Sequence, residues 1–245
     1  MSGNAECINS CEKFKVQGTL FNNCKNSGYS SSVPEYCTGG EITISDCGRY
    51  NVAETYRRYS TPLILDLKDN GLEFTSIEEG VYFDLNGDGV IEKTAWTPIQ
   101  NEFDDAFLWL DKNLNGKIDN GKELFGDQNG EENGFYELAK YDKNKDKVIN
   151  NKDEIYKKLK LWVDMNADGK IDNGEVKSLP EANVTEINLE FRVEYDKNGN
   201  IKTDKHGNIT GFVGSFKQLI ETIVDGVKTL IEKIGTMIDV FFATS

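Results

Sequence analysis

A pattern of alternating acidic and amide side chains recurs four times in the middle of this sequence and constrains the fold more than any other feature. Each copy begins with aspartate and places Asp or Asn at every second position, as in Asp164-Met-Asn166-Ala-Asp168-Gly169. Ca²⁺ takes roughly 6–8 oxygen ligands at about 2.3–2.6 Å, and EF-hand loops supply them from positions 1, 3, 5, 7, 9 and 12. We therefore predict a chain organised around EF-hand-like calcium loops.

The copy from residue 164, here loop IV, matches this order most completely. Gly169 stands at the turn position and Glu175 at position 12, where a carboxylate can bind through both oxygens. Ordinary Asp/Asn/Gly turns need no acid at that place. The predicted ligands of loop IV are Asp164, Asn166, Asp168, the Lys170 carbonyl, Asp172 and Glu175.

The copy from residue 142, loop III, has Lys147 where glycine is expected, so we predict weaker binding. A side chain in the left-handed conformation costs roughly 1–2 kcal/mol. Loops III and IV start 22 residues apart, which is too close for a standard EF-hand pair but is typical of dockerin-type calcium repeats. The predicted ligands of loop III are Asp142, Asn144, Asp146, the Val148 carbonyl, Asn150 and Asp153.

The copy from residue 111, loop II, places its final acid one residue late. Position 12 is Lys122 and Glu123 follows it, so we predict a one-residue insertion that restores the site. The predicted ligands of loop II are Asp111, Asn113, Asn115, the Lys117 carbonyl, Asp119 and Glu123.

The copy from residue 84, loop I, has Ala95 at position 12 and needs a ligand from elsewhere. Upstream, Asp66-Leu-Lys68-Asp69-Asn70-Gly71-Leu-Glu73 resembles a degraded copy with lysine at the third position. The two segments either share one ion or are simple turns. The predicted ligands of loop I are Asp84, Asn86, Asp88 and the Val90 carbonyl, with Glu92 as a further candidate.

The formal net charge of −14 lies entirely outside residues 1–60, where basic and acidic residues balance. Nucleic acid and anionic lipid both need a basic surface, so we expect no nucleic-acid partner. No apolar run is long enough to span a membrane. Cation binding should relieve the self-repulsion of the acidic part and stabilise its fold.

All five cysteines (7, 11, 24, 37 and 47) lie in the first fifty residues. This clustering favours a disulfide-linked region in an oxidising compartment, with one thiol left over. The alternative is a zinc site that uses Cys7-x3-Cys11. The start of the chain has neither a basic stretch nor an apolar core, so we expect a trimmed signal or another export route.

The apolar pattern predicts an α+β fold with three parts: a Cys-rich irregular region over 1–60, a calcium-binding module over 61–214, and a C-terminal amphipathic helix over 215–245. An apolar stripe over 216–242 favours the helix, with docking on the same domain, self-association or partner binding as its use. Short apolar runs predict strands, and helical spacing predicts helices elsewhere. The predicted strands are 63–67, 81–85, 91–96, 107–110 and 184–195, and the predicted helices are 134–141 and 153–161.

The run Pro62-Leu-Ile-Leu-Asp-Leu, the loop I run from Val81, and the run from Leu110 through Glu123-Leu-Phe-Gly-Asp127 resemble the calcium-binding self-processing module of bacterial RTX proteins of the iron-regulated meningococcal type. The resemblance implies that calcium folds the module, which then cleaves an Asp-Pro bond at its own N-terminus. In that reaction the Asp carboxylate attacks its own peptide carbonyl and forms an anhydride, and the new end can be joined to a lysine.

The bond that matches the cleaved one is Thr61-Pro62, and the chain contains no Asp-Pro. Threonine cannot form the anhydride, so we expect no catalytic residues and no self-cleavage. The favoured function is calcium-dependent folding of an exported or cell-surface bacterial protein, and we expect it to be associated with virulence. The alternatives are an active self-processing enzyme, or an adhesin-like surface protein that works through the cysteine region and the terminal segment.

Overall fold

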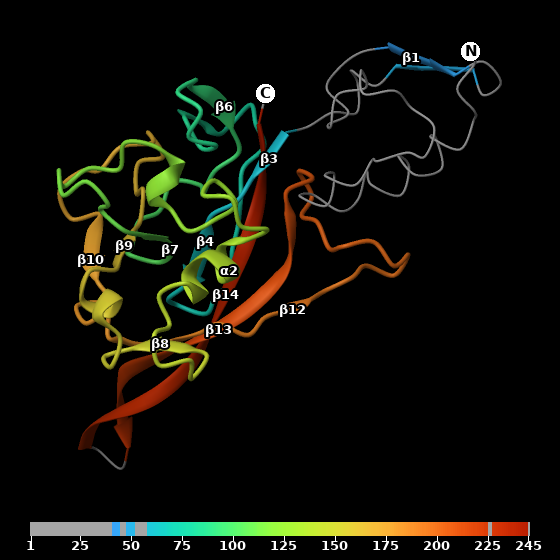
Figure 1. The fold of residues 1–245 in the computed structure, drawn as a ribbon. Helices are drawn as coiled ribbons and strands as arrows, with labels where there is room; N and C mark the ends of the chain where they lie inside the picture. Colours follow the sequence, from blue (N-terminus) through green and yellow to red (C-terminus); the bar gives the residue numbers. More distant parts are fainter. Residues whose placement is uncertain (1–40, 45–47, 52–57, 225–226, 245) are drawn as a thin grey trace.

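The structure, a computed structural model, describes residues 41–44, 48–51, 58–224 and 227–244, whose regular elements are mostly antiparallel β-strands (Figure 1). One sheet holds twelve strands, with the path β10-β9-β7-β4-β14-β13-β11-β8, while β1 and β2 form a separate pair. The strands are β1 (Glu41–Ile44), β2 (Gly48–Asn51), β3 (Arg58–Ser60), β4 (Leu63–Asp66), β5 (Val81–Phe83), β6 (Glu92–Thr94), β7 (Asp105–Trp109), β8 (Val148–Asn150), β9 (Lys160–Trp162), β10 (Val176–Ser178), β11 (Val184–Asn188), β12 (Arg192–Val193), β13 (Ile209–Val224) and β14 (Val227–Thr244).

Helices are short in the described part of the chain, so the predicted α+β class is wrong and the fold is predominantly β. The helical elements there are α2 (Gly134–Ala139) and the 3-10 helices η3 (Gly121–Glu123) and η4 (Glu154–Lys157). None of the helices within these described ranges is long and apolar enough to cross a membrane. The predicted disulfides and the alternative zinc site concern cysteines outside the described residues.

The predicted amphipathic helix over 216–242 is instead a β-hairpin made of β13 and β14. The two strands pair antiparallel up to Val224 opposite Val227. Ile220 lies opposite Ile231, and β-branched residues of this kind fit a pleated sheet better than a helix. The apolar residues that seemed to follow a helical period therefore occupy both faces of a long hairpin.

A turn signal in the sequence could have identified this hairpin. Asp225-Gly226 lies between two runs rich in Ile, Val and Thr, and Asp-Gly is a preferred two-residue hairpin connection. The strands on either side end at Val224 and begin at Val227. The helical interpretation gave this dipeptide too little weight.

Gly235→Ala tests the hairpin directly, because the two interpretations predict opposite signs. A Cβ at Gly235 would lie 2.3 Å from a ring atom of Phe216, its cross-strand partner. We expect the variant to lose about 1–3 kcal/mol of unfolding free energy in a urea titration. In a helix the same change would stabilise by up to about 1 kcal/mol. Thr236→Ala is the neighbouring control, and a stabilised Gly235→Ala protein would contradict the hairpin.

β14 lies in the middle of the sheet and contacts the chain next to the Thr61-Pro62 bond. It pairs with β13 on one side and with β4 on the other, where Ile238 lies opposite Ile64. The Val240 N–H also donates to the Pro62 carbonyl (3.1 Å). The C-terminal part of β14 and the Thr61-Pro62 bond are therefore neighbours in space.

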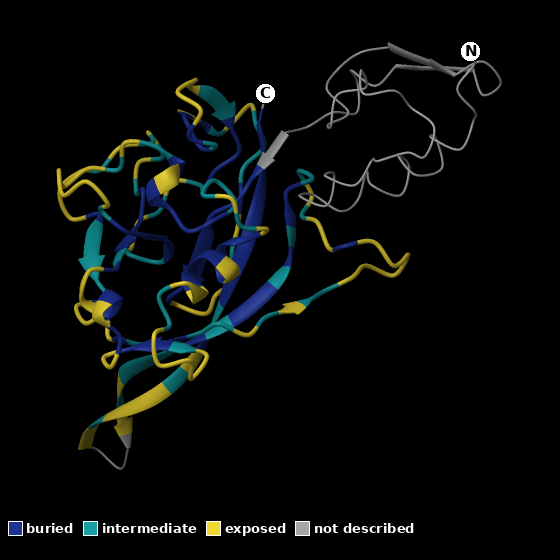
Figure 2. Cartoon of the chain, in the orientation of Figure 1, coloured by how far each residue is buried: buried dark blue, intermediate teal, exposed yellow. Residues whose placement is uncertain are grey.

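The two largest of the three apolar clusters in the described residues pack on this sheet, where Figure 2 shows buried strands. One contains Phe135 of α2 with Leu108 and Leu161. The other is aromatic, with Trp96 between Phe107 (ring centroids 4.5 Å apart) and Trp162 (5.7 Å). The free end of the β13–β14 hairpin lies outside both clusters, and its exposed apolar residues are Ile223, Val227, Leu230, Ile231 and Ile234.

The local predictions were mixed. The strands predicted at 63–67, 81–85, 91–96 and 107–110 are β4 to β7, and the helix predicted at 134–141 is α2. The strand predicted at 184–195 is divided into β11 and β12. The helix predicted at 153–161 is wrong: only η4 is helical, and Leu161 and Trp162 of β9 pair with β7 because that pairing buries both side chains.

Candidate functional site

Loop IV is closed by hydrogen bonds from its own backbone to its acidic side chains. Asp164 accepts from the N–H groups of Asp168 (3.1 Å) and Gly169 (2.7 Å). Ala167 and Gly169 have positive φ angles of 53° and 75°, which fold the backbone around the Asp164 carboxylate. The predicted ligands at positions 1 and 5 are thus held at one end of the loop.

Glu175 holds the other end of loop IV. Its two carboxylate oxygens accept from the N–H groups of Met165 and Asp172, each at 2.8 Å. Asn166 donates to Asp172 (2.9 Å), so the position 3 and position 9 side chains also meet. The acid predicted at position 12 therefore reaches across the loop.

Loop II has the same arrangement in spite of its different length. Asp111 accepts from the N–H groups of Asn115 (3.0 Å) and Gly116 (2.8 Å). Leu114 and Gly116 have positive φ angles of 62° and 75°, close to those of the equivalent residues in loop IV. The start of the two loops is therefore folded in the same way.

Glu123 takes the place in loop II that Glu175 takes in loop IV. It accepts from the N–H groups of Lys112 (3.1 Å) and Asp119 (3.0 Å). Lys122, which occupies position 12 by simple counting, points to loop I and donates to the Gly87 carbonyl (2.5 Å). The 3-10 turn η3 absorbs the extra residue and brings the acid to the loop.

Loop III is folded similarly, with two lysines in the left-handed region. Asp142 accepts from Lys147 N–H (2.9 Å), and Lys145 and Lys147 have φ angles of 60° and 66°. Asp153 accepts from Asn150 N–H (3.1 Å) through one oxygen, while its buried Oδ1 has no hydrogen-bond partner. An oxygen without a partner at the position 12 acid fits a cation ligand.

Loop I has the first half of the arrangement only. Asp84 accepts from the N–H groups of Asp88 (3.1 Å) and Gly89 (3.0 Å). The Asp84 carbonyl accepts from Gly121 N–H (2.8 Å), which joins loop I to loop II. Glu92, the further candidate ligand of loop I, lies in β6.

Asp164 connects loop IV to the aromatic cluster. The Trp96 indole N–H donates to Oδ2 of Asp164 (2.8 Å), and Asp164 is fully buried. Burial raises the pKa of Asp164 to about 6, and the Glu175 carboxylate adds to the rise, although the Gly169 and Asp168 amides oppose it. A bound cation would reverse this rise because it favours the charged form. All the predicted metal ligands of loop IV are oxygen atoms, which Ca²⁺ prefers.

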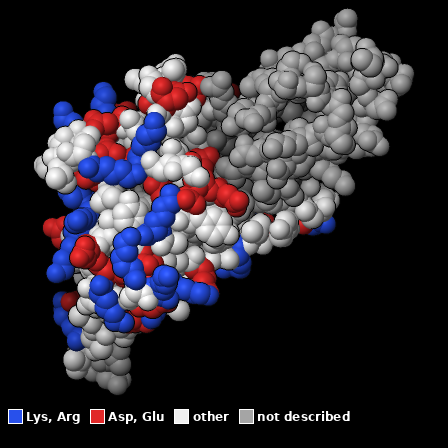
Figure 3. Space-filling model, in the orientation of Figure 1, with Lys and Arg blue, Asp and Glu red and all other residues white. Residues whose placement is uncertain are grey.

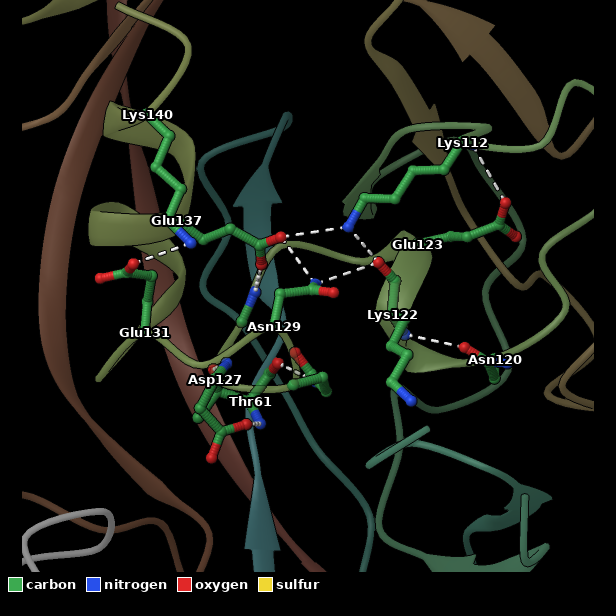
Figure 4. Close-up of polar contacts among 12 residues, drawn as sticks. Thr61, Lys112, Asn120, Lys122, Glu123, Asp127, Asn129, Glu131, Glu137 and Lys140 are labelled. Atoms are coloured by element: carbon green, nitrogen blue, oxygen red, sulfur yellow. Dashed lines mark hydrogen bonds and ion pairs between the residues drawn. The ribbon is translucent and has the colours of Figure 1, made fainter. Parts of the chain in front are cut away.

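A second group of polar contacts is centred on Thr61, with Asp127 beside it (Figure 4). Asp127 accepts from Thr61 N–H (3.2 Å), and its own N–H donates to Thr61 Oγ1 (3.1 Å). Gln128 Nε2 donates to the Thr61 carbonyl oxygen at 2.5 Å. A Cβ at Gly126 would lie 1.7 Å from that same oxygen, so the backbone can approach it only as glycine.

Two further acids, from α2 and β14, are buried next to this group. Burial raises the pKa of Asp127 to about 7 and that of Asp239 well above its ordinary value. Asp239 accepts from Gly134 N–H (2.9 Å). Glu137 accepts from Gly126 N–H (2.9 Å), and burial raises its pKa while the nearby Lys112 lowers it. Of these acids, Asp127 can therefore be protonated near neutral pH.

One short segment connects loop II to Thr61. Glu123 closes loop II, and four residues later Asp127 binds Thr61. Between them the Phe125 carbonyl accepts from Leu63 N–H (2.8 Å). Lys112 of loop II also forms an ion pair with Glu137 (3.2 Å). A change in the shape of loop II would therefore reach the Thr61-Pro62 bond directly.

Sequence reasoning singled out Asp127 only as part of a motif and missed Glu137 and Asp239 altogether. Asp239 lies 105 residues beyond its partner Gly134, and no local spacing reveals such a contact. The motif Glu123-Leu-Phe-Gly-Asp127 was the one available signal, because it combines a loop ligand with residues that contact Thr61.

Comparison with known proteins adds two findings. The profile of the SPM domain matches residues 63–225. The chain is also similar to the Iron-regulated protein FrpA of Neisseria meningitidis serogroup C, with 33% identity over 177 residues that cover 69% of this chain. The same match covers 14% of that relative, so this chain corresponds to a small part of its length.

Proposed function

This chain belongs to the SPM domain family, and we propose that it is a calcium-binding module that completes its fold when the ion binds. The observation that carries the proposal is the shared closure of loops II and IV. Glu123 and Glu175 stand at different sequence positions but accept from equivalent backbone amides. Turn formation alone gives no reason for a distant acid to return to each loop.

The negative charge of the chain supports coupling between ion binding and folding. Each loop gathers two or more carboxylates, which repel one another in the absence of a cation. On the face drawn in Figure 3, basic and acidic side chains are interspersed, so the excess negative charge is not gathered in one patch there. A ligand that binds only the folded chain stabilises it by mass action.

We place this module in an exported bacterial protein. The similarity to a meningococcal iron-regulated protein supports a bacterial origin. Calcium reaches millimolar levels outside cells, where even the weaker sites of this kind are filled. The same chain would stay loosely folded inside the cell and become compact outside it.

Self-processing is a second candidate. It is favoured by the hydrogen bond that Gln128 donates to the Thr61 carbonyl oxygen and by the acids near Thr61. Asp127 accepts from the Thr61 N–H, one peptide before the bond that would be cleaved. The residue that would attack is nevertheless threonine, whose hydroxyl cannot form a cyclic anhydride. We therefore propose that the natural chain retains the surroundings of the reaction but does not cleave itself.

A calorimetric calcium titration of chelator-stripped protein tests the proposed function. We expect saturable heat from two to four loop sites, with affinities between the sensor range and about millimolar. Far-UV circular dichroism on the same samples should show strand content rising with calcium. A titration without heat up to several millimolar calcium would overturn the proposal and leave the loops as turns.

A further inference from the structure

A group of three aspartates outside the four loops lies where β4 ends and β7 begins. One carboxylate oxygen from each of Asp66, Asp104 and Asp105 lies within 4.8 Å of the other two. Two oxygens on opposite sides of one Ca²⁺ are separated by about twice the roughly 2.3–2.6 Å bond length. The spacing of the three aspartates therefore suits a common calcium ion.

The strand pairing places two of these charges directly against each other. Asp66 and Asp105 are register partners in the antiparallel β4–β7 pair, and they are only 3% and 6% exposed. Like charges directly opposite in a sheet destabilise it. A buried pair of this kind needs a cation or a proton between its members.

Asp105 provides the observation that points to a ligand. Its Oδ1 is buried and has no hydrogen-bond partner. Burial and the neighbouring Asp104 and Asp66 carboxylates raise the pKa of Asp105 to about 7, although the Glu73 backbone amide opposes the rise. An unpaired buried carboxylate oxygen is costly unless it binds an ion or is protonated.

Asp66 begins a loop that is folded like the four calcium loops. It accepts from the N–H groups of Asn70 (3.3 Å) and Gly71 (2.9 Å), and Asp69 and Gly71 have positive φ angles of 59° and 98°. Lys68, which stands where a third ligand is expected, instead forms an ion pair with Glu102 (2.8 Å). Its ammonium therefore has another partner than the three aspartates.

The Asp104 carboxylate lies against the part of this loop where Lys68 replaces the third ligand. Its carboxylate accepts from Lys68 N–H (3.0 Å) and from the Asn70 amide (2.7 Å). The group also borders a surface pocket lined by Glu73, Gln100 and other polar residues, through which an ion and its water ligands can enter.

We propose that Asp66, Asp104 and Asp105 form a further calcium site, in which the start of β7 completes the incomplete loop that follows β4. This site uses acids from two separate segments and is independent of loops I to IV. The inference rests on the proposed function only for the identity of the ion, calcium. Binding there would fasten β4 to β7 at the edge of the loop.

Asp105→Asn tests this site, with Glu175→Gln as the loop IV reference and Glu221→Gln, from an exposed ion pair with Lys228 on the hairpin, as the charge control. Bound calcium is counted by native mass spectrometry of the full chain at saturating calcium. We expect Asp105→Asn to bind one ion fewer than the natural chain, and Glu221→Gln to bind the same number. An unchanged count in both Asp105→Asn and Asp104→Asn would overturn the site.

A thermal melt in chelator at pH 8 separates an ion site from a purely structural carboxylate. Removing one of three crowded charges should leave the melting temperature of Asp105→Asn equal to or above that of the natural chain. If Asp105→Asn loses an ion while Glu175→Gln loses none, this site stands and the proposal for loop IV fails. The reverse pattern, with the count of Asp104→Asn also unchanged, supports loop IV and overturns this site.

Discussion

Glu175→Gln is expected to weaken calcium binding at loop IV at least tenfold and to remove most of the stabilisation that this loop gains from the ion. The change removes one negative charge and the bidentate ligand at position 12, while keeping the size of the side chain. Hydrogen bonds and contacts of charged groups contribute about 1.5–3 kcal/mol, and tenfold in affinity corresponds to about 1.4 kcal/mol. Calorimetry and calcium-dependent melting measure the two effects.

Glu221→Gln is the matched control. It removes the same charge, but from an exposed ion pair with Lys228 on the hairpin (2.7 Å). In loop II the structure makes a sharper prediction. Glu123→Gln should weaken binding as Glu175→Gln does, whereas Lys122→Gln should leave loop II unchanged. Equal affinity of Glu175→Gln and the natural chain, with both folded, would show that the acid only supports a turn.

The family and the conformation of the loops were within reach of the sequence because both depend on local spacing. Gly169 and Gly116 stand where the backbone requires a positive φ, and the loop acids follow at fixed distances. The insertion before Glu123 was also predictable, since an acid one residue late can be accommodated by a short turn. Calcium binding by these residues remains a prediction.

The terminal hairpin and the buried acids were beyond local reasoning for a physical reason. An apolar stripe rich in Ile and Val satisfies a helical period and a two-faced strand almost equally, and the choice depends on its partners. Here β14 pairs with β4, more than 170 residues earlier in the chain. The surroundings of Thr61 and the Asp66–Asp105 pair also depend on contacts between segments that are far apart in the sequence.

Thr61→Asp is expected to restore cleavage of the bond between residues 61 and 62 when calcium is added, whereas the natural chain stays intact. The introduced carboxylate would attack its own backbone carbonyl carbon, a C–O bond would form, and the C–N bond to Pro62 would break. The proline nitrogen takes a proton as it leaves, and water then opens the anhydride to an ordinary aspartate. Mass spectrometry would show two fragments that together weigh one water more than the chain.

The residues around Thr61 favour this outcome. Gln128 already donates to the carbonyl oxygen on which negative charge would develop, and such a donor lowers the barrier most when it is held in place beforehand. Asp127 accepts a hydrogen bond from the N–H of residue 61, one peptide before the bond that would break. Its pKa, raised to about 7, suits a group that gives a proton to a leaving nitrogen near neutral pH. The segment from Glu123 to Asp127 makes this arrangement depend on loop II.

Three controls separate the chemistry from the fold. Thr61→Asn has nearly the same shape as Thr61→Asp but no nucleophilic carboxylate, so it should remain whole. Thr61→Asp in chelator should also remain whole if loop II holds the reacting groups in place. Adding Gln128→Ala to Thr61→Asp should slow cleavage by roughly 10²–10³-fold, as the loss of an oxyanion donor does elsewhere. An uncleaved Thr61→Asp protein that folds and binds calcium would show that these neighbours stabilise the fold and do not assist the reaction.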